Sequence, residues 1–133
     1  LRMKDDGNLK FKGGKLKEAE GLYRDGLSHL DTVKNENQGL LDLKKTILLN
    51  LSTVLNKAGE YKQVLVNCTH ALDIDEKSVK GYFLRSQANK AMQQYEEAVM
   101  DIKEAIKLSP ADKSFREEFE TLKAMKKKHN AGY

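Results

Sequence analysis

Six polar residues in this chain of 133 residues could bind a ligand together. What they share is a positive charge or a directed amide: Lys4, Asn8, Lys12, Asn50, Lys80 and Arg85. Lysine and arginine supply charge-assisted hydrogen bonds, while asparagine supplies oriented donors. The six include no acidic residue, so they predict a site for an anion, and above all for a carboxylate.

The spacing of these residues supports that interpretation. Lys4, Asn8 and Lys12 recur every four residues, which places them on one face of a helix. Asn50 interrupts the apolar run ILLNLSTVL, where a polar side chain needs a partner. A structural amide satisfied within the protein is the alternative for Asn50, and a solvated surface is the alternative for each lysine.

The elements that must position these residues repeat along the chain. Tyr61 and Tyr95 begin similar stretches 34 residues apart, and Ala71 and Ala105 keep the same interval. The stretch FKGGKLKEAEGLYRDGLSHLD has the same shape, with an insertion of 11 residues before the next unit. A helix–turn–helix unit of 34 residues is the signature of a tetratricopeptide repeat.

The expected fold is therefore all-α, a right-handed superhelix of three helix pairs plus a C-terminal capping helix. The seven helices are expected at about 2–12, 16–30, 40–57, 61–72, 78–92, 95–108 and 112–127, with turns at 13–14, 58–59 and 93–94 and a polar loop over 31–39. We expect one domain over 1–133, with repeats at about 1–31, 45–78 and 79–112, an insertion at 32–39 and a final helix at 112–128.

The final helix carries an apolar stripe at Phe115, Phe119 and Leu122. Its expected role is to cover the open end of the repeat stack. The basic run Lys126-Lys127-Lys128 leaves an alternative, a helix that binds calmodulin or another acidic surface.

Composition and motifs argue against several other functions. The net charge of +4 is spread along the chain, which disfavours nucleic-acid binding, and no apolar run is long enough to span a membrane. The histidines form no metal-ligand spacing, and we expect no catalytic site, metal or cofactor. Cys68 is the single cysteine and stands at a core position, so it cannot form an internal disulfide. A chain without disulfides fits a reducing compartment, and we expect the cytoplasm, with the nucleus as the alternative.

Three motifs give the chain a family resemblance. KDDGNLKFK, LLNLSTVLNKAGEY and VKGYFLRSQA are similar to the helices of carboxylate-clamp tetratricopeptide domains. The chain most resembles the domains of FKBP-type and cyclophilin-type immunophilins and of the aryl hydrocarbon receptor-interacting protein. This resemblance covers nearly the whole chain.

The resemblance implies a co-chaperone module that binds the acidic C-terminal tail of heat shock protein 90 or heat shock protein 70. In the family, positions equivalent to Lys4, Asn8, Asn50 and Lys80 hold the tail, and an arginine follows four residues after the last. Leu84 stands at that position here, and we expect the next residue, Arg85, to substitute.

Two alternatives remain at this stage. The repeats could form a scaffold for a different partner with a degraded clamp. They could also be the regulatory C-terminal domain of a peptidyl-prolyl isomerase whose catalytic domain precedes Leu1.

Overall fold

The computed structural model describes residues 16–31 and 37–131. These residues form six helices, which are α2 (Leu16–Asp31), α3 (Gln38–Lys57), α4 (Tyr61–Ile74), α5 (Val79–Ala91), α6 (Tyr95–Leu108) and α7 (Lys113–Ala131). The helix expected at 2–12 lies outside the described residues, together with Lys4, Asn8 and Lys12. The all-α fold class is confirmed, and no strand occurs in the described ranges.

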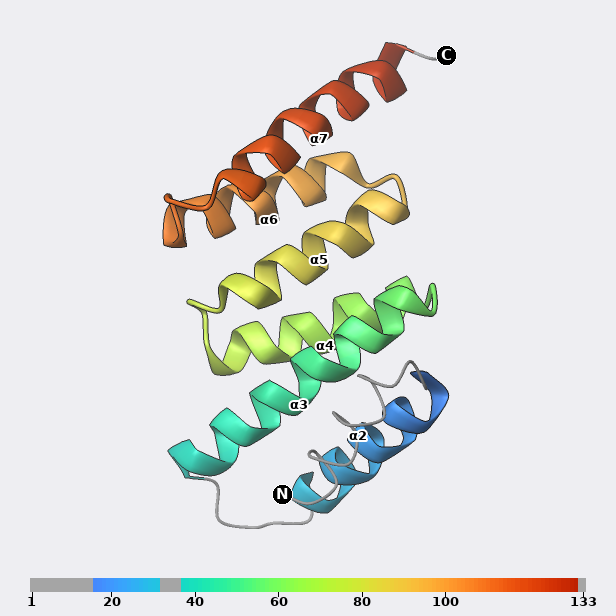
Figure 1. Ribbon diagram of the computed structural model, residues 1–133, viewed down its shortest axis with the longest axis vertical. Coiled ribbons are helices and arrows are strands. Elements are labelled where there is room, and N and C mark those ends of the chain that lie inside the picture. The colour runs from blue at the N-terminus through green and yellow to red at the C-terminus, as the bar shows by residue number, and fades with distance from the viewer. Residues whose placement is uncertain (1–15, 32–36, 132–133) are drawn as a thin grey trace.

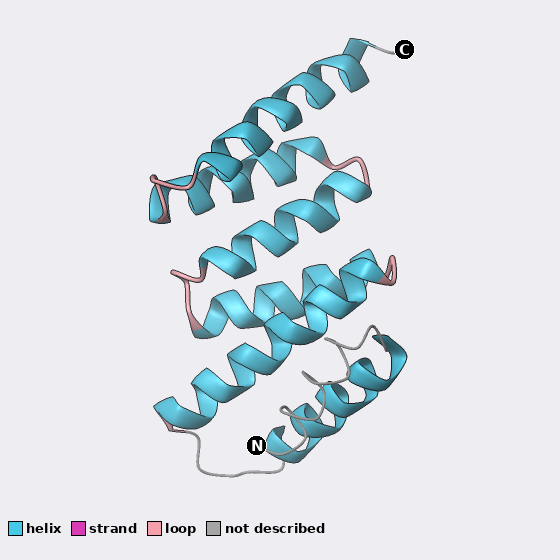
Figure 2. Cartoon of the chain, in the orientation of Figure 1, coloured by secondary structure: helices cyan, strands magenta, loops and turns pink. Residues whose placement is uncertain are grey.

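The helices stack along the long axis of the molecule, with α2 at one end and α7 at the other (Figure 1). Each described helix packs on the next one, and α3 also contacts α5. Short loops join α3 to α4, α4 to α5 and α5 to α6, as Figure 2 shows. This arrangement is the superhelical repeat fold that the 34-residue period predicts.

Local sequence signals explain where the helices end. The turn expected at residues 58–59 is present, and Gly59 adopts a φ of 79°, which glycine reaches at little cost. In the turn between α5 and α6, expected at residues 93–94, Gln93 adopts a φ of 61°. Asn37 caps α3 by accepting a hydrogen bond from the Leu40 amide at 2.9 Å.

Two expected boundaries differ from the structure. The loop predicted over 31–39 is too long, because α2 extends to Asp31 and the Asn37 cap starts α3 at Gln38. The final helix continues to Ala131 and passes the predicted end at Lys127. The basic side chains of its last turn complement the helix dipole, which favours this extension.

The core is made of two clusters of small and aliphatic side chains. The larger cluster joins α2, α3, α4 and α5 and includes Tyr23, Ile47 and Cys68, all almost fully buried. Cys68 is therefore the core residue that its repeat position predicts. Burial raises the pKa of its thiol to about 11, which keeps it protonated and unreactive at neutral pH.

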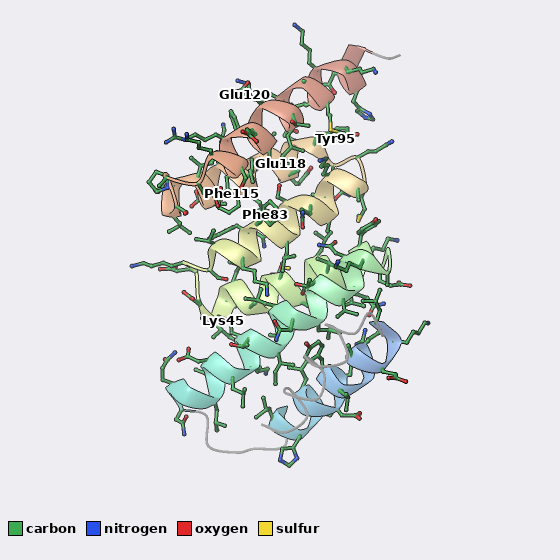
Figure 3. The ribbon with its side chains drawn as sticks, viewed as in Figure 1. Lys45, Phe83, Tyr95, Phe115, Glu118 and Glu120 are labelled. Carbon is green, nitrogen blue, oxygen red and sulfur yellow. The ribbon has the colours of Figure 1, made fainter. Side chains whose placement is uncertain are left out.

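The second core cluster lies between α6 and α7. Phe115 and Leu122 are buried there, and Phe119 packs against them. The rings of Phe83 and Phe115 meet at 5.2 Å between centroids, and both are labelled in Figure 3. The apolar stripe of α7 thus covers the last repeat.

Neither a membrane helix nor a metal site is found in the described part of the chain. None of its helices combines the length and the apolar character needed to cross a bilayer. No group of three or more metal-binding side chains converges in those residues.

Candidate functional site

The structure brings two of the predicted site residues together, Asn50 on α3 and Lys80 on α5. The ammonium group of Lys80 lies 3.4 Å from the side-chain oxygen of Asn50, at the long end of a hydrogen bond. The neighbours of Asn50 along α3, including Leu49 and Leu51, are buried, so the helix itself is held firmly in the core.

The start of α5 is built to hold Lys80 in place. The hydroxyl of Ser78 accepts a hydrogen bond from the Gly81 amide at 3.1 Å and caps the helix. A Cβ at Gly81 would come within 3.0 Å of the Leu72 side chain, so glycine lets α5 approach α4 closely. Lys80 lies between these two residues, in the first turn.

Lys80 differs from other cations of the structure in its electrostatic surroundings. Lys45 pairs with Asp75 at 3.0 Å, and Lys90 pairs with Glu118 at 2.8 Å. Lys80 pairs with no carboxylate among the described residues. Desolvation by burial lowers the pKa of its ammonium group, and the nearby Cys68 acts weakly in the opposite direction.

Arg85 is engaged elsewhere. Two of its guanidinium nitrogens donate to the two carboxylate oxygens of Asp101 on α6, both at 2.8 Å. A third nitrogen donates to the Thr69 hydroxyl on α4 at 3.1 Å, and the Asp101 hydrogen bonds raise the pKa of Arg85. The structure therefore does not bring Arg85 to the Asn50–Lys80 pair.

Leu84 lines a pocket of about 530 Å³ to which α3, α4, α5 and α7 contribute side chains. Its walls are Thr53, Asn56, Lys57, Tyr61, Leu84, Gln87, Lys90, Ala91 and Met125. Asn56 donates to the Leu84 carbonyl at 3.4 Å and so links α3 to α5. The side-chain oxygen of Asn56 is buried and has no hydrogen-bond partner among the described residues.

The sequence interpretation missed this pocket and the partner of Arg85. A signal for the partner does exist, because Asp101 shares the buried face of α6 with Ala98, Ile102 and Ala105. A carboxylate on a core-facing stripe requires a cation nearby. The pocket leaves no such local signal, because its walls come from separate helices.

The Asn50–Lys80 pair is suited to binding an anion. Lys80 presents an exposed positive charge, and the amide oxygen of Asn50 contacts it without neutralising it. A carboxylate placed beside Lys80 would gain a charge-assisted hydrogen bond and would displace no internal acid from it.

Comparison with known proteins agrees with the fold. The model of the family "Tetratricopeptide repeat" matches residues 79–112. A DnaJ homolog subfamily C member 7 homolog of Schizosaccharomyces pombe is 31% identical over 125 residues, which are 94% of this chain. The chain spans only 25% of that curated relative.

Two solved structures are similar over most of their length. The first TPR of Spaghetti (RPAP3), bound to the HSP90 peptide SRMEEVD, is 22% identical with a TM-score of 0.79 and covers 93% of this chain and 92% of its own. The other is the C-terminal TPR-containing domain of a Plasmodium falciparum protein assigned as FK506-binding, which is 30% identical with a TM-score of 0.86. The match covers 98% of this chain and 89% of that domain. Identity at this level over nearly the whole of both domains, together with the repeat fold, shows that the chain belongs to the tetratricopeptide repeat family.

Proposed function

We propose that this domain binds the acidic C-terminal tail of a heat shock protein of the 90 or 70 class, through a free terminal carboxylate. The observation that carries the proposal is the position of Lys80, an exposed cation on α5 that contacts the amide of Asn50 and pairs with no acid in the described residues. The fold relative bound to SRMEEVD supports the choice of ligand.

The proposal divides the acidic groups of the ligand between two sets of residues. Lys4, Asn8 and Asn50 would hold the terminal carboxylate, together with Lys12, which follows Asn8 by four residues in the sequence. Lys80 holds an acidic side chain of the same tail. Arg85 would have to leave Asp101 to reach the peptide, so we assign it an internal role instead. We expect a dissociation constant of roughly micromolar order, about −8 kcal/mol, and weaker binding at higher salt.

Titration of SRMEEVD by calorimetry tests this function, with the free-acid peptide compared with the same peptide amidated at its C-terminus. We expect the amidated peptide to bind at least about tenfold more weakly, because the terminal carboxylate is lost. Equal affinity for the two forms would overturn the proposal.

The substitution Asn50→Asp gives a sharper test at the site itself. It changes the shape of the side chain very little and supplies Lys80 with an internal carboxylate. We expect affinity for the free-acid peptide to fall about tenfold or more, and Lys80→Met to have a similar effect. Lys62→Met is the matched control, because Lys62 is exposed on α4. A loss of the same size in Lys62→Met would mean that the site lies elsewhere.

A further inference from the structure

The loop between α6 and α7 contains the only proline of the chain, and a serine comes directly before it. Ser109 and Pro110 follow the last residue of α6, and α7 begins at Lys113 (Figure 2). Proline lacks a backbone N–H and disfavours helical geometry in the residue before it. Ser109 accordingly adopts a φ of −137° and a ψ of 70°, outside the helix. The chain therefore has a single Ser-Pro step, and that step lies in a loop.

This loop is open to solvent and is held by few contacts. Ser109 is half-buried, whereas Pro110 and Ala111 are exposed. The amide of Asp112 donates to the Ser109 carbonyl at 3.2 Å, and the Ser109 hydroxyl makes no hydrogen bond within the described residues. Residues 113–114 at the start of α7 are also exposed. An enzyme that straightens the loop and this first turn would therefore break no core contact.

A guanidinium lies beside the Ser-Pro step. Arg116 on α7 donates to the carbonyl of Pro110 at 2.6 Å, six residues back along the chain. It pairs with no carboxylate in the described part of the chain, although Asp112 and Glu120 stand four residues before and after it. Glu120 pairs with Lys123 instead, at 3.5 Å. Because a guanidinium has five N–H donors, Arg116 keeps donors for an anion placed next to Pro110.

A phosphate group on Ser109 would need such a cation. Ser109 caps the C-terminal end of α6, where the helix dipole is negative and where a phosphate brings a charge of nearly −2. The forked donors of Arg116 match the oxygens of a phosphate, and Lys113 adds a second exposed cation at the start of α7. These two cations would offset the repulsion between the phosphate and the end of α6.

We propose that Ser109 is a phosphorylation site for protein kinases that require proline after the target serine, and that Arg116 holds the phosphate. The Ser109 hydroxyl oxygen attacks the γ-phosphorus of ATP and forms a bond to it. The bond between the γ-phosphorus and the β–γ bridging oxygen breaks, ADP leaves, and the hydroxyl proton passes to the aspartate base of the kinase. The inference is independent of the proposed function, because it uses no residue of the peptide site.

The first experiment treats the folded protein with a purified mitogen-activated protein kinase, ATP and Mg²⁺, and locates the phosphate by mass spectrometry. We expect one phosphate per chain, on Ser109. Ser109→Ala should remove it, and Pro110→Ala should slow its transfer by about tenfold or more. Ser114→Ala is the matched control and should be modified like the unaltered protein. Phosphate on Ser114 in place of Ser109, or no phosphate at all, would overturn the proposal.

Thermal melting tests the role of Arg116. Phosphorylation should change the melting temperature of the unaltered sequence by less than about 1 °C, and should lower that of Arg116→Gln by about 2–4 °C. Lys127→Gln is the matched control, because it removes a positive charge from an exposed position about 16 Å further along α7. It should respond to phosphorylation like the unaltered sequence.

Phosphorus NMR gives a second measurement on the same proteins. The second pKa of phosphoserine is ordinarily about 6, and a bound guanidinium lowers it because it favours the doubly charged form. The pKa should therefore be lower in the unaltered sequence than in Arg116→Gln. Asp112 and Lys113 affect it in both proteins, so only the difference is informative. Equal pKa values together with equal melting shifts would show that Arg116 does not hold the phosphate.

Discussion

Lys80 and Arg85 are five residues apart on one helix, yet their positive charges have different hydrogen-bond partners. Arg85 has a carboxylate partner with two short hydrogen bonds, whereas Lys80 has the amide oxygen of Asn50. The charge of Lys80 is therefore available to a ligand.

The lowered pKa of Lys80 predicts a pH dependence of binding. A bound carboxylate favours the charged ammonium, so binding raises the pKa and takes up a proton at alkaline pH. The affinity for the free-acid peptide should fall as the pH rises, starting below the ordinary lysine pKa of about 10.4. Titrations between about pH 7 and pH 10.5 measure this.

Lys80→Arg is the control for this prediction. A guanidinium stays charged throughout that range, so the part of the pH dependence that belongs to Lys80 should disappear. Lysines elsewhere in the chain titrate in both proteins, so only the difference between them is informative. Identical pH profiles would contradict the assignment of the charge to Lys80.

At the scale of the elements, the pair formed by Arg85 and Asp101 ties α5 to α6. The Asp101 side chain is 9% exposed and that of Arg85 is 26% exposed, so the pair is largely screened from water. Asp101→Ala would leave the guanidinium partly buried without its carboxylate. We expect a loss of about 2–4 kcal/mol in the free energy of unfolding, measured with urea.

The double variant Arg85→Met with Asp101→Leu tests whether the lost stability comes from the unpaired guanidinium of Arg85. It removes both charges and keeps apolar volume, so most of the lost stability should return. It should also bind the tail peptide with unchanged affinity, because Arg85 pairs with Asp101 on α6 and does not contact the ligand in our proposal. A tenfold loss of peptide affinity in a folded double variant would show that Arg85 does contribute to peptide binding.

At the scale of the whole molecule, the fold is stabilised by contacts between neighbouring helices. Each described helix packs mainly on its neighbours in the chain. Local unfolding at one end of the stack therefore need not unfold the other end at the same time. The end covered by α7 depends on Leu122, which is fully buried against α6.

Leu122→Ala should therefore weaken the C-terminal end first. We expect a loss of about 2–4 kcal/mol in the free energy of unfolding, from lost apolar contact and the cavity left behind. Hydrogen exchange followed by mass spectrometry should show faster exchange in α6 and α7, with α3 still protected. Equal loss of protection in all described helices would show a single cooperative unit instead.

Much of the fold could be predicted because its signals are local and repeated. The helix α6 runs from Tyr95 to Leu108, as its apolar period and flanking turn residues predict. Gly59 ends the turn after α3, and the buried Cys68 occupies the core position of its repeat. The start of α3 was harder to predict, because the Asn37 cap stands inside a polar stretch that also suits a loop.

The candidate site could be predicted only in part. Asn50 and Lys80 were found because each interrupts or opens a helix at a repeat position, and the structure brings the two side chains together. The role of Arg85 could not be predicted from its position after Leu84. A long side chain can reach more than one helix, so its partner depends on which carboxylate the packing brings near.

The sequence by itself determined the repeat architecture, the helix order and the presence of cations and amides along the first helix of each repeat, because these follow from periods and residue types within about 34 residues. Only the tertiary structure decided that Arg85 is held by Asp101, that Lys80 contacts an amide, and that Leu84 lines a pocket with Met125 of α7. The physical reason is that charge pairing and cavity shape depend on side chains from different helices, whose relative positions no local pattern contains.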